Sequence, residues 1–526
     1  MQGAIRSAAG RRVRQFYARD PRAEQRKLFG ELIAMAAMTQ FGKDYGFSRL
    51  AGLPFEQGYA AYRDRVPIRT YHDFWNDYFA ETGSLSPSGT QRIDLHNTTW
   101  PGRISLFCET SGTTAPSKFI PFSRQMFAAN RQAALDLISC YLEKHPRSAI
   151  PGGKVLYMSG STALNDMGRG VYSGDMSAIT LRFRPWYLAG FVEPSAILSS
   201  LPWEEKLQGM AELLLSDPQI RVISGVPPWI ILLLRRCRDL SGKTLRQILP
   251  QLELIIHGGT SLKPYRAEFD ELFDDNLPSM LEVFPSSEAF MGFQCAGDAD
   301  MRLTPFYGAF FEFVRFEELD ERGRPAPHAV AIPLEQVVTG QRYAIILSTC
   351  AGLWRYHIGD TIRFTSLSPH LIEFTGRDRF LDKLEEKVTQ EEVERVVSEL
   401  NRSADCAIRE FMVASDIPGR RHVWFVAGTS VHDREQLAVQ VDLKLRGFNA
   451  DYATFREQGR IAVPNVVILP ADVIYDWSQA ERNKLGGQSK IPHIDPTPDG
   501  SLAASLGEYY SKTYLHHPAN PHFNIR

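Results

Sequence analysis

The chain is poor in cysteine and lacks long apolar runs, and each shortage removes a class of protein. Its six cysteines among 526 residues are isolated and form no CxxC pair, so neither a zinc ribbon nor a dense disulfide framework is expected. The most apolar stretch, Trp229 to Leu234, ends at Arg235-Arg236, far short of the ~18 residues that a membrane span needs. An apolar signal segment is also missing near residue 1, so a cytoplasmic protein without membrane association is expected.

An excess of charge of one sign is missing as well. The 59 basic and 61 acidic side chains give a formal net charge of −2, which argues against a nucleic-acid-binding surface. The 44% hydrophobic content is ordinary for a globular protein, and the length allows one large domain and a smaller one. At the start of the chain, apolar Leu28, Leu32 and Met35 predict one amphipathic N-terminal helix. The oligomeric state stays open, with a monomer plausible.

Short apolar strands alternate with helix-like stretches over much of the chain, which favours an α/β fold with largely parallel sheets flanked by helices. The expected strands are Lys154–Ser159, Arg221–Ser224, Leu252–His257 and Met280–Phe284, and the helices are Phe127–Lys144, Trp229–Cys237 and Tyr265–Phe273. Between about 303 and 374 the pattern changes to antiparallel strands, as in Tyr307–Phe316 and Arg342–Thr349. This region is expected to form an antiparallel, β-barrel-like part of the same large domain.

A charged stretch, Gly376 to Arg379, predicts a hinge between two domains. Beyond it, Thr389 and Glu392 form a capping box in front of a helix, and two strands and a long helix follow. The sequence therefore predicts a large domain over residues 1–379 and a small, mobile α+β domain over residues 380–526. The terminal His516, His517 and His522 have no carboxylate or cysteine nearby in the sequence, so an exposed tail is expected there.

The stretch from Thr110 to Lys118 has the composition of a phosphate-binding loop. Ser111, Gly112, Thr113 and Thr114 follow an apolar segment, and small hydroxyl residues beside a glycine let N–H and O–H groups converge on phosphate oxygens. It is not a Walker loop, which needs Gly before the lysine and Ser or Thr after it. Taken alone, a solvated Ser/Thr turn explains the pattern equally well.

Three later segments place further polar groups at strand ends, where ligands of α/β sheets gather. His257 to Leu262 contains Gly258 and Gly259, which allow a flat ligand such as a purine to approach. Phe284 to Glu288 ends the next strand with a lone carboxylate suited to Mg²⁺, and Trp354 to Asp360 carries an Asp suited to ribose hydroxyls. Each also has a plain structural explanation, respectively a strand-to-helix turn, a helix N-terminal Glu and an exposed hairpin Asp.

Taken in order, these motifs resemble the acyl-adenylating superfamily of acyl-CoA synthetases, peptide-synthetase adenylation domains and luciferases. Within it, the chain resembles the auxin-responsive acyl-acid amido synthetases of plants and their bacterial relatives. The matching segments are Thr110–Thr114, Phe284–Glu288, Tyr356–Asp360 and the late Gln488-x-Lys490-x-Pro492. The chain departs from the family pattern at Thr110, Phe284-Pro285 and His357, and the loop is about one residue short before Lys118. The resemblance therefore leaves open whether Lys118 is a phosphate ligand.

The resemblance implies an ATP-dependent enzyme that adenylates a carboxylic acid and then transfers the acyl group to an amino acid or another amine. Its cofactors would be ATP and Mg²⁺. By the matching positions, Glu288 would hold the metal, Lys387 and Lys490 would act on the phosphates, and Arg377 with Asp378 would form the hinge. The implied ATP-binding residues are Ser111, Gly112, Thr113, Thr114, Gly259, Ser287, Asp360 and Lys387.

The acyl-acid pocket is less well marked in the sequence. Tyr157, Trp186, Val226 and Phe310 are apolar residues near strand ends that could line it, although core packing explains each one alone. Two other functions remain open: an acyl-CoA or carrier-protein ligase that uses the same adenylation step, and an inactive ligand-binding homologue. Retention of Glu288, Asp360 and both lysines disfavours the inactive protein, since a decayed site should lose charges that are costly to bury.

Overall fold

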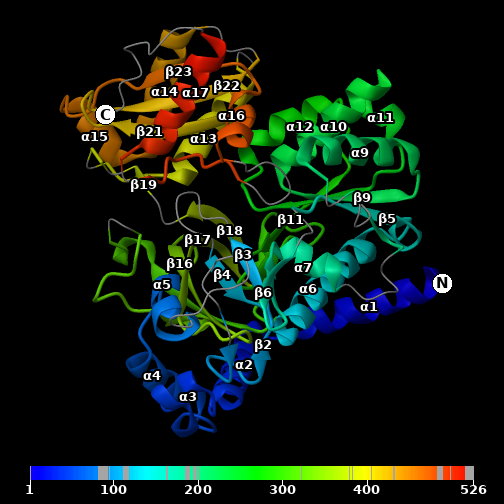
Figure 1. Cartoon of the computed structure of the whole chain (residues 1–526), viewed down its shortest axis with the longest axis vertical. Helices are drawn as coiled ribbons and strands as arrows, with labels where there is room; N and C mark the ends of the chain where they lie inside the picture. Colours follow the sequence, from blue (N-terminus) through cyan, green and yellow to red (C-terminus); the bar gives the residue numbers. More distant parts are fainter. Residues whose placement is uncertain are drawn as a thin grey trace.

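In the computed structural model, two groups of helices lie at opposite ends of the molecule (Figure 1). The structure describes residues 2–80, 93, 95–110, 118–160, 164–183, 190–193, 198, 201–320, 323–377, 380–381, 383–384, 386–403, 406–429, 433–482, 490–497 and 499–515. The elements after residue 380 lie beside α9 (Trp203–Ser216), α10 (Pro227–Ser241) and α12 (Arg266–Leu272). The helices α2 (Pro21–Ala36), α3 (Gln40–Asp44) and α4 (Phe55–Arg65) lie at the opposite end.

Within the described ranges, one sheet of 12 strands forms the backbone of the large domain, in the order β15-β14-β16-β17-β18-β13-β12-β11-β10-β9-β5-β8. In that order the strands are Ile332–Pro333, Ala309–Arg315, Arg342–Thr349, Tyr356–Leu367, His370–Arg377, Met301–Leu303, Phe290–Phe293, Ser279–Pro285, Leu254–Gly258, Ile220–Gly225, Lys154–Tyr157 and Val192–Glu193. The predicted α/β class is confirmed. The parallel and antiparallel parts, however, form a single continuous sheet.

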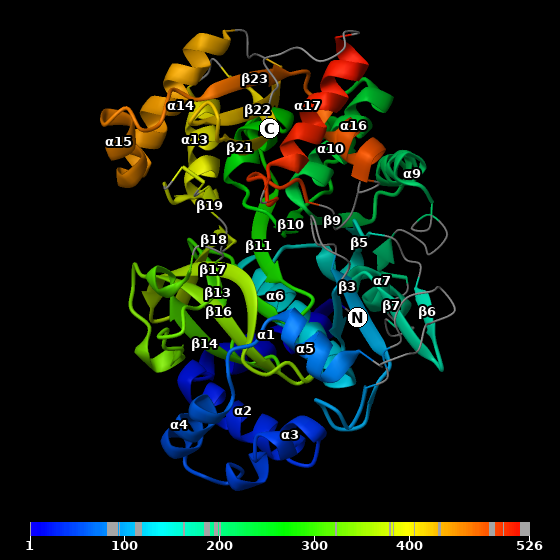
Figure 2. The same ribbon diagram turned by 60° about the vertical axis from the view of Figure 1, so that its left-hand side comes forward.

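The strand β11 is the junction between the two parts. It pairs in parallel with β10 and antiparallel with β12, because the short turn at 286–289 reverses the chain directly into its neighbour. In Figure 2, β11 runs between the upper and lower halves of the molecule. Residues that follow β10 and β11 therefore lie at the level where the two halves meet.

A second sheet carries the start and end of the predicted phosphate-binding loop. Its order is β4-β3-β7-β6, with strands Lys118–Pro121, Leu106–Thr110, Val171–Gly174 and Asn165–Gly168. The antiparallel pair β3–β4 brings Thr110 opposite Lys118. Ser111, Gly112, Thr113 and Thr114 lie between these two residues, outside the described part of the chain.

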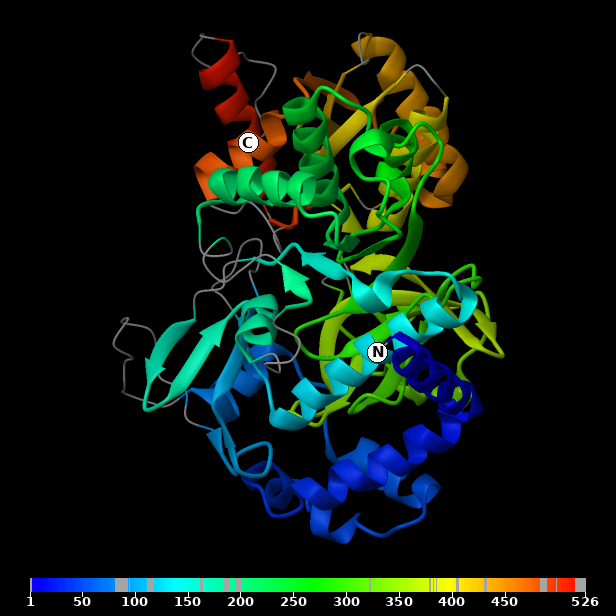
Figure 3. The same ribbon diagram turned by 90° about the vertical axis from the view of Figure 1, so that its right-hand side faces the viewer.

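The N-terminal segment forms two helices, so the prediction of one helix is wrong. The first, α1 (Gln2–Ala18), ends before Asp20, whose carboxylate accepts a hydrogen bond from the Arg22 N–H at 3.0 Å and caps α2. Pro21 follows as the first residue of α2, where its missing N–H costs nothing. Figure 3 shows α1 lying along α6 (Arg124–Lys144), where Arg12 Nε donates to Asp136 at 2.8 Å. None of the helices in the described ranges is long and apolar enough to cross a membrane.

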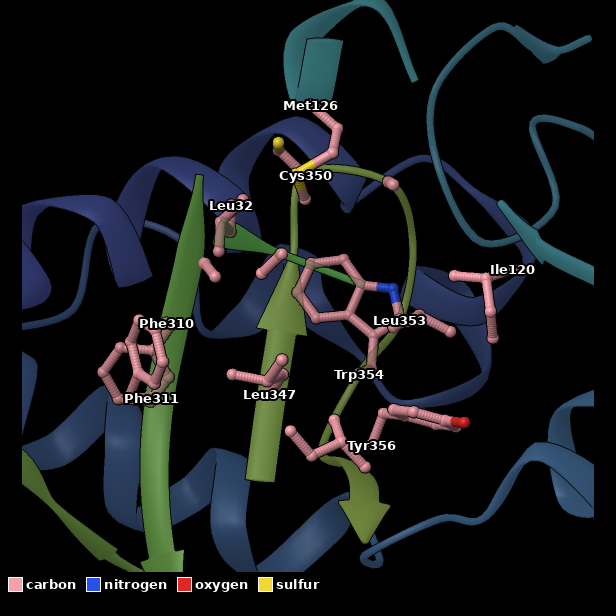
Figure 4. Packing of buried hydrophobic residues seen from close by; sticks show 14 of the residues in the cluster. Leu32, Ile120, Met126, Phe310, Phe311, Leu347, Cys350, Leu353, Trp354 and Tyr356 are labelled. Carbon is pink, nitrogen blue, oxygen red and sulfur yellow. The ribbon is translucent and has the colours of Figure 1, made fainter. Parts of the chain in front are cut away.

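The lower core of the large domain is rich in aromatic residues and contains one buried ion pair. Figure 4 shows Phe310, Leu347 and Trp354 in this cluster. Beside it, Arg355 Nε lies 3.2 Å from Glu312 Oε1, with the two side chains 5% and 0% exposed. The Arg355 guanidinium also donates to the carbonyl oxygens of Arg63 and Val66. Arg355 therefore fixes the N-terminal helices to β14 and β17, although its sequence motif was expected to serve a ligand.

The small domain is built on three strands, β21 (Ile408–Asp416), β22 (Arg421–Gly428) and β23 (Asn465–Leu469). The helix α13 (Gln390–Arg402) begins at the predicted capping box of Thr389 and Glu392. One hydrophobic cluster continues from the large domain into the small one. Its members include Trp229, Leu233, Phe269, Phe425, Tyr475, Trp477 and Ile491. The two domains thus share a packed core in this pose.

We expect Glu312→Leu to lower the free energy of unfolding by about 3–5 kcal/mol, because it leaves the buried Arg355 charge without its carboxylate. Urea unfolding followed by circular dichroism measures the loss. The double variant Glu312→Leu/Arg355→Met removes both charges and should recover much of the stability. A double variant less stable than Glu312→Leu alone would contradict the assignment.

Candidate active site

The turn after β10 forms the floor of a site between the two domains. Gly259 has a φ of +88°, a conformation that favours glycine. A Cβ at this position would lie 3.3 Å from Cε of Lys490 and 3.4 Å from Cγ2 of Val226. Gly259 and Val226, from two strand ends of the large domain, therefore lie directly under the side chain of Lys490 from the small domain.

The turn after β11 holds Glu288 beside this floor. The Ser286 hydroxyl oxygen accepts hydrogen bonds from the N–H groups of Glu288 and Ala289, at 3.2 and 3.1 Å. This local turn fixes the direction of Glu288, and Ser287 lies within it. Burial raises the pKa of Glu288, the nearby Asp360 carboxylate raises it further, and the Lys118 ammonium opposes both. Additional positive charge nearby would therefore stabilise the ionised form of Glu288.

Asp360 approaches from β17 and is held by Arg377. The two residues are partners across β17 and β18, and Arg377 Nε lies 3.4 Å from Asp360 Oδ1. The Asp360 side chain is 14% exposed and that of Arg377 is 49% exposed, and the charges of both act on Lys490 of the small domain. Asp378, the other predicted hinge residue, lies outside the described residues.

Lys490 completes this group of charges. The residue as a whole is exposed, but its ammonium end lies against Gly259. Removal of the ammonium from water lowers the pKa of Lys490 to about 8; Arg377 adds to the shift, and Asp360 and Glu288 oppose it. The structure therefore brings together four of the sequence-predicted residues: Gly259, Glu288, Asp360 and Lys490.

Lys118, which the sequence left uncertain, faces the same site. Its ammonium lies 5.9 Å from the centre of the Tyr71 ring, and its charge acts on both Glu288 and His357. Arg377 and Ser286 are further contributors that the motifs did not assign to the site. A clue to Ser286 was present in the sequence, since a serine hydroxyl can accept hydrogen bonds from backbone N–H groups two or three residues later in a local turn.

Lys387 is the predicted residue that stands apart from this group. It is exposed and precedes β20 (Val388–Thr389). Its carbonyl oxygen accepts a hydrogen bond from Asn449 Nδ2 at 3.1 Å. Within the described part of the chain, its ammonium forms no ion pair. In this pose, Lys490 and not Lys387 is the lysine beside Glu288 and Asp360.

The candidates for the acyl-acid pocket separate into three cases. Val226 lies beside Gly259, and Tyr157 ends β5 opposite Ser224 of β9, so both are at the sheet edge that carries the site. Trp186 lies outside the described residues. Phe310 is 1% exposed and its ring packs against Phe29 and Tyr59. The expectation that Phe310 lines the pocket is therefore wrong, because the N-terminal helices bury it in the core.

Two open cavities lie elsewhere, along α1. The larger, of about 660 Å³, is lined by Tyr17, Cys140, Arg302 and neighbouring residues. The smaller, of about 470 Å³, is lined by Phe306, His370 and others near the start of α2. Neither is lined by a residue of the group around Gly259, so the candidate site is defined by its charged side chains and strand ends.

Comparison with known protein families shows to which family the chain belongs. The GH3 family N-terminal domain matches residues 12–226, the GH3 family central domain residues 303–377, and the GH3 family C-terminal domain residues 389–498. The chain belongs to the GH3 family. The relationship confirms the resemblance to the auxin-responsive amido synthetases, and the three matches together cover most of the chain in the expected order.

Two curated GH3 relatives come from Arabidopsis thaliana. Indole-3-acetic acid-amido synthetase GH3.15 is 28% identical over 180 residues, which is 31% of this chain and 30% of the relative. Probable indole-3-acetic acid-amido synthetase GH3.1 is 27% identical over 229 residues, 39% of this chain and 36% of the relative. The chain thus spans about a third of the length of the curated relatives it matches.

Solved structures show the GH3 fold over nearly the whole chain. The GH3.15 acyl acid amido synthetase has a TM-score of 0.74 at 15% identity and covers 95% of this chain and 96% of its own. The 2-hydroxyisobutyryl-CoA ligase in the postadenylation state, in complex with 2-HIB-AMP, has a TM-score of 0.56 at 11% identity and covers 92% and 91%. The predicted fold, a large α/β domain with a small C-terminal α+β domain, matches both.

We expect the affinity for pyrophosphate, an anion of the size of two phosphate groups, to fall as the pH rises through about 8, because Lys490 is charged below this pKa and neutral above it. One coupled proton limits the fall to about tenfold per pH unit. Titration calorimetry between pH 6.5 and 9.5 measures it. Lys490→Met should bind weakly with a flat profile, whereas the exposed Lys27→Met should keep the wild-type profile. An unchanged profile in Lys490→Met would show that another group titrates.

Proposed function

We propose that this GH3 protein is an ATP-dependent acyl acid amido synthetase. In the first half-reaction a carboxylate attacks the α-phosphorus of ATP, which forms an acyl-adenylate and releases pyrophosphate. In the second, an amine, such as that of an amino acid, attacks the acyl carbon and AMP leaves, so that an amide is formed. Family membership supports this reaction class, and the names of the relatives refer to the same kind of product.

The observation that carries the proposal is the position of Lys490, whose side chain lies over Gly259 beside Glu288 and Asp360. Catalysis of phosphoryl transfer consists mostly of positioning and of stabilising the negative charge on the phosphate oxygens, so preorganised cations at the phosphates are a main requirement. Lys490 and Lys118 would neutralise phosphate oxygens, together with the 111–114 loop. Asp360 would accept hydrogen bonds from the ribose hydroxyls, and the turn at Gly259 would admit the base.

Glu288 is the residue suited to Mg²⁺. Burial and the neighbouring Asp360 disfavour its charged form, which a divalent cation would reverse. Among the described residues, no group of three or more His, Cys, Asp or Glu side chains is arranged to hold a metal. This suits Mg²⁺, which commonly takes one or two protein carboxylates and completes its shell with phosphate oxygens and water. When bound, the ion would supply positive charge to the leaving pyrophosphate.

We infer a domain division at residues 1–379 and 380–526, with Arg377 at the connection. Val226 and Tyr157, at the edge of the sheet that carries Gly259, would contact the acyl acid. The amine would have to reach the acyl-adenylate from the space between the two domains. Lys387 is retained as a second phosphate-contacting candidate, because its side chain is exposed and forms no ion pair with any described residue.

Acid-dependent exchange of pyrophosphate into ATP tests the first half-reaction. We expect exchange with at least some members of a panel of aryl and alkyl acids, and hydroxylamine should trap the activated acyl group. Amino acids should then discharge the adenylate to amides. No exchange with any acid would exclude the enzyme, and discharge by coenzyme A in place of amines would identify an acyl-CoA ligase.

We expect Lys490→Met to reduce exchange by roughly 100-fold or more, the scale of losing one preorganised charge contact. Lys387→Ala should also reduce adenylation steeply, while binding of ATP, measured by calorimetry, persists. The exposed Lys27→Met is the matched control and should retain wild-type exchange. Near-wild-type turnover of Lys387→Ala would remove that residue from the mechanism without affecting the role of Lys490.

A further inference from the structure

Three residues after Lys490, His493 belongs to a buried polar cluster. The reaction proposed above gives no role to the residues of this cluster. His493 is 2% exposed, and its two ring nitrogens face two different carboxylates. Nδ1 lies 2.8 Å from Glu394 Oε1, and Nε2 lies 3.2 Å from Glu410 Oε1. The His493 ring also stacks on Phe411, with the ring centres 4.2 Å apart. The imidazole is thus fixed in position and in orientation.

The cluster joins the two domains. The Tyr265 hydroxyl, from the large domain, donates to Glu410 Oε2 at 3.1 Å and lies 3.2 Å from His493 Nε2. On the small-domain side, the Tyr475 hydroxyl donates to Glu410 Oε2 at 3.2 Å, and Gln390 Nε2 donates to Glu394 at 2.7 Å. Burial alone would lower the pKa of His493, but its hydrogen bonds with Glu394 and Glu410 raise it to about 9. His493 therefore favours its protonated form and lies between two buried carboxyl groups.

The chain between His493 and Lys490 has little freedom. Ile491 is buried in the hydrophobic cluster shared by the two domains, and Pro492 restricts the backbone. The carbonyl oxygen of His493 accepts from the Val413 N–H at 2.9 Å, and the N–H of Asp495 donates to the Val413 carbonyl at 2.8 Å. Anchoring at residues 491–495 therefore determines where the Lys490 side chain leaves the small domain.

We propose that His493, held by Glu394, Glu410 and Tyr265, is a positioning residue that keeps Lys490 over Gly259 for the adenylation half-reaction. The inference rests on the proposed function of Lys490, and His493 itself contacts no substrate. Tyr265 is the part of the cluster that belongs to the large domain. Its hydroxyl ties the segment that carries Lys490 to the same domain that carries Glu288 and Asp360.

The two half-reactions should depend on this cluster to different extents. During adenylation, Lys490 must face the phosphates while pyrophosphate leaves, and a misplacement of about 1 Å can cost on the order of 100-fold in rate. Transfer from a preformed acyl-adenylate releases no pyrophosphate. A variant that only shifts Lys490 should therefore slow the first half-reaction and spare the second, whereas general destabilisation should affect both alike.

Two variants of the His493 cluster, here called the latch variants, and one matched control test this difference. Tyr265→Phe removes one hydroxyl from the cluster and His493→Gln removes its cation. Tyr452→Phe is the control, because the Tyr452 hydroxyl also donates to a buried carboxylate, Asp442 at 2.7 Å, within the small domain alone. We expect both latch variants to slow acid-dependent pyrophosphate exchange by roughly tenfold or more, and amide formation from a synthetic acyl-adenylate by less than about twofold. The control should keep the wild-type ratio of the two rates.

Hydrogen–deuterium exchange supplies a readout that does not depend on activity. The amides of Val413 and Asp495 form the two backbone hydrogen bonds between β21 and the His493 segment, and they should exchange faster in His493→Gln and Tyr265→Phe than in Tyr452→Phe. Equal losses in both half-reactions, or unchanged amide exchange in the latch variants, would overturn the positioning role. Faster amide exchange in His493→Gln and Tyr265→Phe, combined with a wild-type protein that adenylates no acid, would instead overturn the proposed function and leave the anchoring intact.

Discussion

The hydrophobic cluster shared by the two domains is the constraint on which the site depends. Trp229 of α10 and Tyr475 of the small domain lie with their ring centres 5.5 Å apart, inside a continuous core that also takes in Ile491. Burial of apolar surface is non-directional, so this core brings the domains together without fixing the positions of individual polar side chains. The buried polar contacts of Tyr265, Glu410 and His493 add the direction that places Lys490 over Gly259.

The electrostatics of the site follow from the same arrangement. Away from water, the carboxylates of Glu288 and Asp360 would repel each other, and so would the positive charges of Lys490 and Arg377. When all four are together, their charges partly compensate one another. The cost of burying charge that is left uncompensated raises the pKa of Glu288 and lowers that of Lys490. A bound polyanion with its metal would relieve both. The near-zero net charge of the chain is consistent with the proposed nucleotide site, because the positive charge around Gly259 is local.

The sequence predicted those parts of the site whose position follows from the ends of strands. Gly259 and Glu288 follow β10 and β11, and neighbouring parallel strands end at one edge, so their proximity could be inferred. It did not predict the role of Arg355, because its partner Glu312 lies on another strand. The expectation for Phe310 is wrong for the same reason, since the helices that carry its partners Phe29 and Tyr59 lie far earlier in the chain. His493 gave no signal, since three distant segments form its surroundings. The break between α1 and α2 was foreseeable, because Asp20-Pro21 is a typical helix start.

The two ends of the long sheet have a consequence for the behaviour of the protein in concentrated solution. In the described part of the chain its outermost strands, β15 (Ile332–Pro333) and β8 (Val192–Glu193), are each two residues long, and Pro333 has no N–H to donate. An exposed edge strand offers unpaired backbone groups on which another chain can add a strand, and short or proline-containing edges deny that template. Despite its width, the sheet as described thus ends in two short edge strands, and such edges discourage aggregation between copies.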